Sequence, residues 1–92
     1  MSNGDCIRTF ESQNNNVNLI IVNNENELIS GSDDYTIKIW NMKTGECLRI
    51  LKGHTNCVIT LIINNANELI SGSDDNTIKI WNMKTGECLR TL

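Results

Sequence analysis

The sequence predicts an all-β fold built from two copies of one four-stranded antiparallel unit. The first observation is a repeat, because residues 28–51 recur as residues 69–92 with only two substitutions. The second is the repeat length of 41 residues, a size typical of one supersecondary unit that is used several times. The third is that no stretch keeps the 3.6-residue apolar period that a helix facing a core requires.

Four strands are expected in each copy, and the second copy shows them most clearly. Residues 57–63 form a mostly apolar run, short enough for a strand that is buried on both faces. Residues 77–81 are β-branched or aromatic and alternate as a strand does. Residues 68–73 lie between these two, and residues 87–92 supply the fourth strand.

Turn residues separate the expected strands. Gly45, in Lys-Thr-Gly, supplies the left-handed residue of a hairpin loop, as does the glycine 41 residues later. Asn-Asn-x-Asn at 23–26 and 64–67 does similar work, because asparagine tolerates a positive φ. Ser-Asp-Asp before Tyr35 or Asn76 predicts a tight acidic turn.

The cysteines and the single histidine argue against a metal site. Cys6, Cys47 and Cys88 are 41 residues apart and occupy one repeated slot, while Cys57 stands alone. There is no Cys-x-x-Cys, and His54 is the only histidine, so a four-ligand zinc site is not expected. We therefore expect reduced, buried thiols, no metal and no cofactor.

Charge and hydropathy narrow the classes of partner. The net charge of −3 and the pI near 4.9, without a Lys/Arg cluster, argue against nucleic acid. The longest apolar run, residues 19–22, is far too short to span a bilayer, and the first residues do not resemble a signal peptide. The expected location is intracellular and cytoplasmic, with the nucleus left open.

The repeated run Leu-Ile-Ser-Gly-Ser-Asp-Asp-x-Thr-Ile-Lys-Ile-Trp-Asn, with Gly53-His54 upstream of its second copy, resembles the WD40 repeat. The resemblance covers nearly the whole chain. It implies that each repeat builds one blade of a β-propeller, the outermost strand coming first in sequence. Residues 1–10 would then be an extra N-terminal outer strand and tail, residues 11–51 the first blade and residues 52–92 the second.

The resemblance also implies a role for the polar residues of each repeat, a structural tetrad in which Trp bonds to Ser, Ser to His and His to Asp. In the second copy its members are His54, Ser71, Asp75 and Trp81. In the first copy they are Ser30, Asp34 and Trp40, with Gln13 in place of the histidine. A catalytic Ser-His-Asp triad is the rival interpretation. The first copy argues against it, because a blade without histidine could not carry out a His-dependent reaction.

The expected function is therefore a non-enzymatic protein-interaction or assembly module. Its candidate partner-binding residues lie in the loops near the tight turns: Asp33, Tyr35, Asp74, Asn76, Asn15 and Asn56. Tyr35 is the strongest single candidate, because an exposed tyrosine can anchor a partner. The repeated aspartates favour a protein or basic peptide as partner. The alternative is a ligand-free shortened or engineered repeat array whose only activity is self-assembly.

Two blades alone would leave two apolar faces open, so the chain is expected to associate head to tail into a closed ring. If every blade joins the ring, two blades per chain exclude a seven-bladed ring. A tetramer of eight blades is favoured over a trimer of six. Residues 5–10 and residues 87–92 of the preceding chain would compete for one outer-edge position, and the C-terminal strand is expected to win because a short hairpin ties it to its neighbour.

Overall fold

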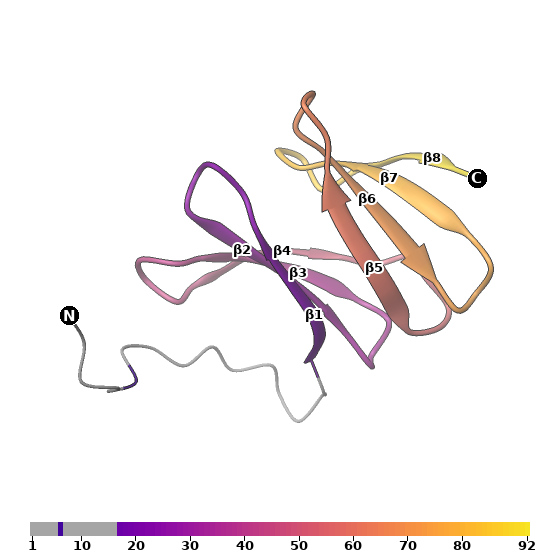
Figure 1. The fold of residues 1–92 in the computed structure, drawn as a ribbon, viewed down its shortest axis with the longest axis horizontal. Coiled ribbons are helices and arrows are strands. Elements are labelled where there is room, and N and C mark those ends of the chain that lie inside the picture. Colours follow the sequence, from indigo (N-terminus) through magenta and orange to yellow (C-terminus); the bar gives the residue numbers. More distant parts are fainter. Residues whose placement is uncertain (1–5, 7–16) are drawn as a thin grey trace.

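The computed structural model describes Cys6 and residues 17–92, apart from the side chain of Asn18. Two four-stranded sheets lie side by side, each with its strands in sequence order (Figure 1). The first sheet contains β1 (Val17–Val22), β2 (Glu27–Ser32), β3 (Ile37–Asn41) and β4 (Cys47–Leu51). The second contains β5 (Val58–Ile63), β6 (Glu68–Ser73), β7 (Ile78–Asn82) and β8 (Cys88–Thr91). Within these described residues, no helix is long and apolar enough to cross a membrane.

The expected strands agree with the observed ones to within one residue at most ends. β6 covers the same residues as its prediction, whereas β7 starts one residue later than expected. The later start has a local cause, since the backbone N–H of Thr77 donates to the Asp75 carboxylate and so belongs to the turn. The predicted outer strand at residues 5–10 lies outside the described residues, except for Cys6.

Left-handed residues close the turns where the sequence places glycine and asparagine. Asn26 and Asn67 each have a φ of 61°, and Gly45 has a φ of 81°. The turn prediction is confirmed at these positions. Two further residues were not anticipated: Tyr35 has a φ of 73° and its counterpart Asn76 a φ of 71°.

Each sheet has two faces that the strand alternation separates. We call the side carrying Trp40 or Trp81 the tryptophan face, and the side carrying Ile37 or Ile78 the isoleucine face. The apolar core forms where the isoleucine face of the first sheet meets the tryptophan face of the second. Its buried members are Ile29, Ile37, Ile39, Leu51, Val58, Leu61, Leu69, Trp81 and Met83. At this junction β5 packs against β1 and β2.

The cysteines differ from the expectation of buried thiols. Cys47 and Cys88 are exposed on β4 and β8, Cys6 is exposed, and Cys57 is half-buried. That expectation is wrong because β4 and β8 form the outer edges of the sheets, where most side chains reach solvent. The thiols' reduced state stays a prediction.

Candidate functional site

The polar residues singled out in the second copy come from two strands, one turn and one connecting segment. Ser71 lies on β6 and Trp81 on the neighbouring β7, whose residues pair in register. His54 lies in the segment between β4 and β5, and Asp75 lies in the β6–β7 turn. The structure brings all four side chains together.

These four side chains form one chain of hydrogen bonds. The Trp81 indole Nε1 donates to Ser71 Oγ over 2.8 Å. Ser71 Oγ lies 2.7 Å from His54 Nε2, and His54 Nδ1 lies 2.9 Å from Asp75 Oδ2. Within the part of the chain that the structure describes, every buried side-chain nitrogen and oxygen has a hydrogen-bond partner. A buried polar chain stabilises the fold only under that condition.

The Asp75 carboxylate is the anchor of this chain. Its Oδ1 accepts the backbone N–H of Thr77 over 2.8 Å as well as the Thr77 hydroxyl, and its Oδ2 accepts the backbone N–H of Thr55. The Thr77 hydroxyl, together with His54 and the two backbone donors, holds the pKa of Asp75 well below its usual value, although burial alone would raise it. Asp75 is therefore charged at neutral pH and joins the turn to the β4–β5 segment.

The first sheet satisfies the matching carboxylate differently. Trp40 Nε1 donates to Ser30 Oγ over 2.9 Å, as in the second sheet. Asp34 Oδ2 accepts a hydrogen bond from Lys38 Nζ over 3.2 Å. Asp34 Oδ1 accepts hydrogen bonds from the hydroxyl groups of the flanking serine and threonine. Burial raises the pKa of Asp34, but the hydrogen bonds from these hydroxyls and the lysine outweigh it and lower the pKa strongly. Gln13, expected in the histidine's place, lies outside the described residues.

The rival catalytic interpretation fails on access. Ser71 is fully buried and its hydroxyl lies against both Trp81 and His54. A nucleophile must reach a substrate carbonyl beside an oxyanion hole, and this hydroxyl has no such path. Nor do the described residues contain a group of histidine, cysteine and acidic side chains that could hold a metal ion. The four hydrogen-bonded side chains instead hold β6, β7, the β6–β7 turn and the β4–β5 segment together.

Comparison with known proteins identifies the family of the repeats. The family model described as "WD domain, G-beta repeat" matches residues 4–41 and residues 45–82. The chain belongs to the WD40 repeat family. The two sheets are thus WD40 blades, and repeats of this family are typically non-catalytic modules for protein interaction.

A solved propeller gives the structural comparison. The chain is similar to the structure described as "Crystal structure of WD40 beta propeller domain of Doa1", with 30% identity and a TM-score of 0.87. The match covers 94% of this chain but 29% of that one, so the chain spans less than a third of its length. None of the curated proteins compared with the sequence matches it significantly.

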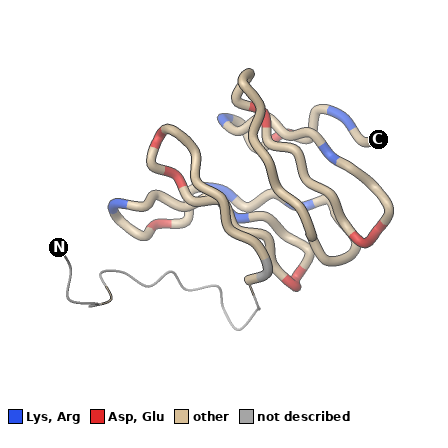
Figure 2. The backbone as a smooth tube through the Cα atoms, in the orientation of Figure 1, with Lys and Arg blue, Asp and Glu red and all other residues tan. Residues whose placement is uncertain are grey.

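The predicted partner-binding residues of the WD40 blades lie at one end of the strands. Asp33, Tyr35, Asp74, Asn76 and Asn56 are all exposed, and Asn15 lies outside the described residues. Figure 2 shows the acidic residues of the β2–β3 and β6–β7 turns. The two blades approach each other here, because the Cys57 thiol of blade 2 lies 3.7 Å from the Asp33 carboxylate of blade 1. Burial raises the pKa of Cys57, and the charges of Asp33 and Asp74 raise it further.

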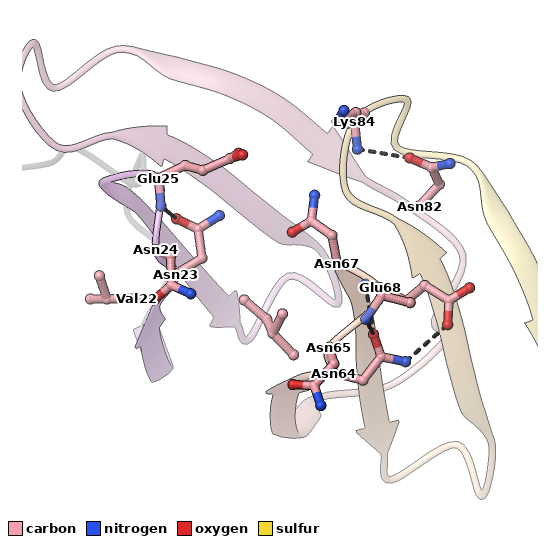
Figure 3. Close-up of a pocket in the computed structure, with 12 residues that line it drawn as sticks. Val22, Asn23, Asn24, Glu25, Asn64, Asn65, Asn67, Glu68, Asn82 and Lys84 are labelled. Atoms are coloured by element: carbon pink, nitrogen blue, oxygen red, sulfur yellow. Dashed lines mark hydrogen bonds between the residues drawn. The ribbon is translucent and has the colours of Figure 1, made fainter.

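Among the grooves of the described part of the chain, two lie between or beside the blades. The larger, of about 750 Å³, separates the asparagine-bearing turns at residues 23–26 and 64–67 (Figure 3). Asn23 and Asn64 are structural there, since each side-chain oxygen accepts two backbone N–H groups of its own turn. The sequence prediction missed this role, for which the repeated spacing of the asparagines was the available signal.

The smaller groove, of about 470 Å³, lies where blade 1 meets the segment between β4 and β5. Its lining residues are Asp34, Tyr35, Thr36, Lys38, Ile50, Lys52, Gly53 and His54. Of these, only Tyr35 was predicted to bind a partner. Ile50 was missed, although its difference from the counterpart in blade 2 was visible in the sequence.

Proposed function

We propose that this chain is a protein-interaction module that associates with copies of itself, blade on blade, to complete a WD40 propeller. The observation that carries the proposal is the contact between its own two blades. There, the isoleucine face of blade 1 covers the tryptophan face of blade 2. The opposite faces have nearly the same sequences, so a second copy could repeat the same contact.

The exposure of matching residues identifies the two uncovered faces. On the tryptophan face, Val58 is fully buried in blade 2, whereas its counterpart Val17 in blade 1 is 42% exposed. On the isoleucine face, Ile37 is fully buried in blade 1, whereas Ile78 in blade 2 is 45% exposed. Side chains that form the core in one blade thus lie in solvent in the other.

Outer-strand residues repeat this difference. Leu51 at the end of β4 is 2% exposed, while Leu92, its counterpart beyond β8, is 65% exposed. Because the two uncovered faces differ from each other, a copy would dock head to tail, and such contacts form rings when the rotation closes.

Energetics favour a closed ring over an isolated pair. Covering the half-exposed aliphatic side chains of both faces contributes on the order of 5–10 kcal/mol, at about 1.5–3 kcal/mol for a fully buried side chain. Association of two molecules costs about 4–15 kcal/mol, so one contact is marginal. A ring has one contact more than an open chain of the same copies, and that last contact immobilises no further molecule.

The ring size follows from two blades per chain. Propellers have about four to eight blades, and we expect four chains with eight blades in preference to three chains with six. The two assemblies would have four or three times the chain mass of 10.4 kDa. Light scattering distinguishes them from each other and from the monomer.

Gly72 provides a variant that targets the contact between chains alone. A Cβ on Gly31, its counterpart, would lie 3.1 Å from Val58 of the facing blade, whereas a Cβ on Gly72 would meet only Thr60, at 3.6 Å. Gly72→Val should therefore fit in a single chain but meet Val17 of a docked copy. The expected result is a folded monomer.

The matched control is Gly31→Val, which places the same side chain at the contact inside the chain and should lower the stability of the fold itself. A wild-type protein that stays monomeric at high concentration would contradict the proposal. An oligomer that survives Gly72→Val unchanged would show that the copies meet elsewhere.

The loop end of the blades carries the second part of the proposal, a basic peptide or protein partner. The supporting observation is the exposure of Asp33 and Asp74 on either side of Cys57. The alternative function is the ligand-free array, in which self-assembly is the only activity. A pull-down with the immobilised chain distinguishes these two functions, with the Asp33→Asn/Asp74→Asn double variant as control. A chain with a basic partner should retain a protein or peptide that the double variant does not retain. A ligand-free array should retain nothing that depends on these two aspartates.

A further inference from the structure

We propose that the 470 Å³ groove beside blade 1 is a peptide-binding site, and that it takes a segment with a bulky apolar side chain next to a carboxylate. The proposal goes beyond self-assembly, because it concerns a surface that the blade-to-blade contact leaves open. Its basis is a comparison that the chain itself provides.

The two repeats act as a natural control for each other. Between residues 28–51 and 69–92, the only differences are Tyr35 against Asn76 and Ile50 against Thr91. Five residues of the first stretch line the groove, and both differences are among those five. Two substitutions scattered at random over the stretch would rarely meet in one small groove.

The chemical character of the two differences also indicates a binding site. Both replace a polar residue of blade 2 with a larger, more apolar one in blade 1. Tyr35 and Ile50 are 43% and 49% exposed, so neither contributes much to the core. Exposed aromatic and aliphatic side chains that converge on a groove are typical of sites that anchor a partner.

The backbone at Tyr35 supports a role other than stability. Its φ of 73° lies in the left-handed region, where asparagine is well tolerated and a bulky residue is an outlier. Blade 2 has asparagine at this turn position with nearly the same φ. Blade 1 therefore carries a less favourable residue where a better one is available, and such strained positions cluster at functional sites.

The charges of the groove select the occupant. Lys38 is neutralised by its ion pair with Asp34, and His54 is held in the hydrogen-bond chain of blade 2. Lys52 is exposed on the rim, and among the described residues it forms no ion pair. The groove thus offers one unneutralised ammonium group beside two apolar side chains, which complements an acidic residue next to an apolar one.

The groove stays open when blades stack. In blade 2 the corresponding positions, Asn76 and Thr91, remain exposed even though blade 1 covers that face of the sheet. A copy docked on blade 1 in the same way would leave Tyr35 and Ile50 equally accessible. Peptide binding and self-assembly are therefore separable.

The test is selection from a random peptide library displayed on phage against the immobilised chain. The competitor in solution is the double variant Tyr35→Asn/Ile50→Thr, which gives blade 1 the groove residues that blade 2 already tolerates. We expect the selected peptides to share an apolar residue next to Asp or Glu. Synthetic copies should bind the wild-type chain at least about tenfold more tightly than the double variant, a difference that fluorescence anisotropy resolves readily.

Two further variants sharpen the assignment. Lys52→Gln should weaken binding and reduce its dependence on salt, because it removes the charge that complements the carboxylate. Leu89→Thr, which removes an exposed apolar side chain on the outer strand of blade 2, should leave the affinity unchanged.

The proposal is overturned if the selected peptides lack acidic residues, if no peptide is enriched over the competitor, or if wild type and double variant bind equally. The peptide-binding proposal and the assembly proposal can be tested independently, because each has its own variant. Gly72→Val should be monomeric yet bind the peptides, and Tyr35→Asn/Ile50→Thr should keep the wild-type mass.

Discussion

At the scale of single residues, the two blades pair the corresponding turn carboxylate with different side chains. Asp75 is held by His54, and Asp34 by Lys38, whose side chain is mostly buried. The counterpart of Lys38 in blade 2, Lys79, instead donates to Thr91 at the surface. The lysine therefore has two roles in one repeated sequence, and its acceptor in blade 2, Thr91, is replaced by Ile50 in blade 1.

Trp81 should be among the most important single residues for stability. It is almost fully buried, and its indole N–H is the first donor of the hydrogen-bond chain. Trp81→Ala should lower the free energy of unfolding by about 3–5 kcal/mol, as for other large aromatic residues removed from cores. Trp81→Phe, which keeps most of the packing, should cost less. Urea unfolding measures both, and a loss for Trp81→Ala as small as a surface substitution's would contradict the role assigned to it.

Acid should weaken the fold through its lowered carboxyl pKa values. The folded-state pKa of Asp75 lies below the ordinary value, so its charged form stabilises the fold. That contribution is complete above the unfolded pKa of about 3.9 and is lost as the pH falls from there toward the folded pKa. Asp75→Asn should lower the free energy of unfolding at pH 7 and make its decline in acid less steep. Part of the decline should remain in this variant, because the pKa of Asp34 is also lowered.

The control for this titration is Asp74→Asn, the exposed neighbour in the same turn. Its unfolding free energy at pH 7 should stay close to that of the wild type, because the Asp74 side chain is exposed and the hydrogen bonds of Asp75 remain. If Asp75→Asn had the same pH dependence of stability as the wild type, the Asp75 carboxylate would not be a group that links proton binding to folding.

At the scale of strands and turns, local chemistry predicted most of what the structure contains. The alternation of residues 77–81 and the short apolar run at 57–63 located strands, and the asparagine turns were placed correctly. The left-handed Tyr35 escaped prediction because tyrosine carries no turn signal, although Asn76 at the matching position did. The Lys38–Asp34 pair escaped because it depends on how far a side chain reaches across a turn.

Residues 1–10 should be dispensable for the sheets. Residues 17–92 already supply four strands to each blade, including β4 and β8 at the outer edges. Deleting residues 1–10 should therefore leave the mass per assembly and the unfolding midpoint nearly unchanged, as light scattering and thermal unfolding would report. A deletion that yields monomers would instead identify the N-terminal segment as the link between chains.

At the scale of the whole molecule, the sequence could not say which faces are covered. Ile37 and Ile78 stand in nearly identical local sequences, yet one is fully buried and the other 45% exposed. The difference comes from their place in the stack, since blade 1 has a neighbour on its isoleucine face and blade 2 has none among the residues that the structure describes. No local pattern records the presence or absence of that neighbour.

Self-assembly of the whole molecule should make its stability depend on protein concentration. Only folded copies can dock, so mass action raises the unfolding midpoint as the concentration increases. Thermal unfolding of the wild type over a wide range of concentrations should show this rise, and Gly72→Val should show none. A wild-type midpoint that is independent of concentration would count against docking.

The sequential strand order has a consequence for the order of folding events. Within each sheet, every strand pairs with the strand next to it in the chain, across a turn of a few residues. Such short loops close quickly, and chains dominated by near-neighbour contacts fold fast. Each blade should thus form as a rapid local event, with the meeting of blades as the later and slower step. Because the repeats are almost identical, a partly folded blade can pack against a blade of another molecule as well as against the other blade of its own chain. Refolding at high protein concentration should therefore produce intermolecular blade contacts before the final arrangement is reached.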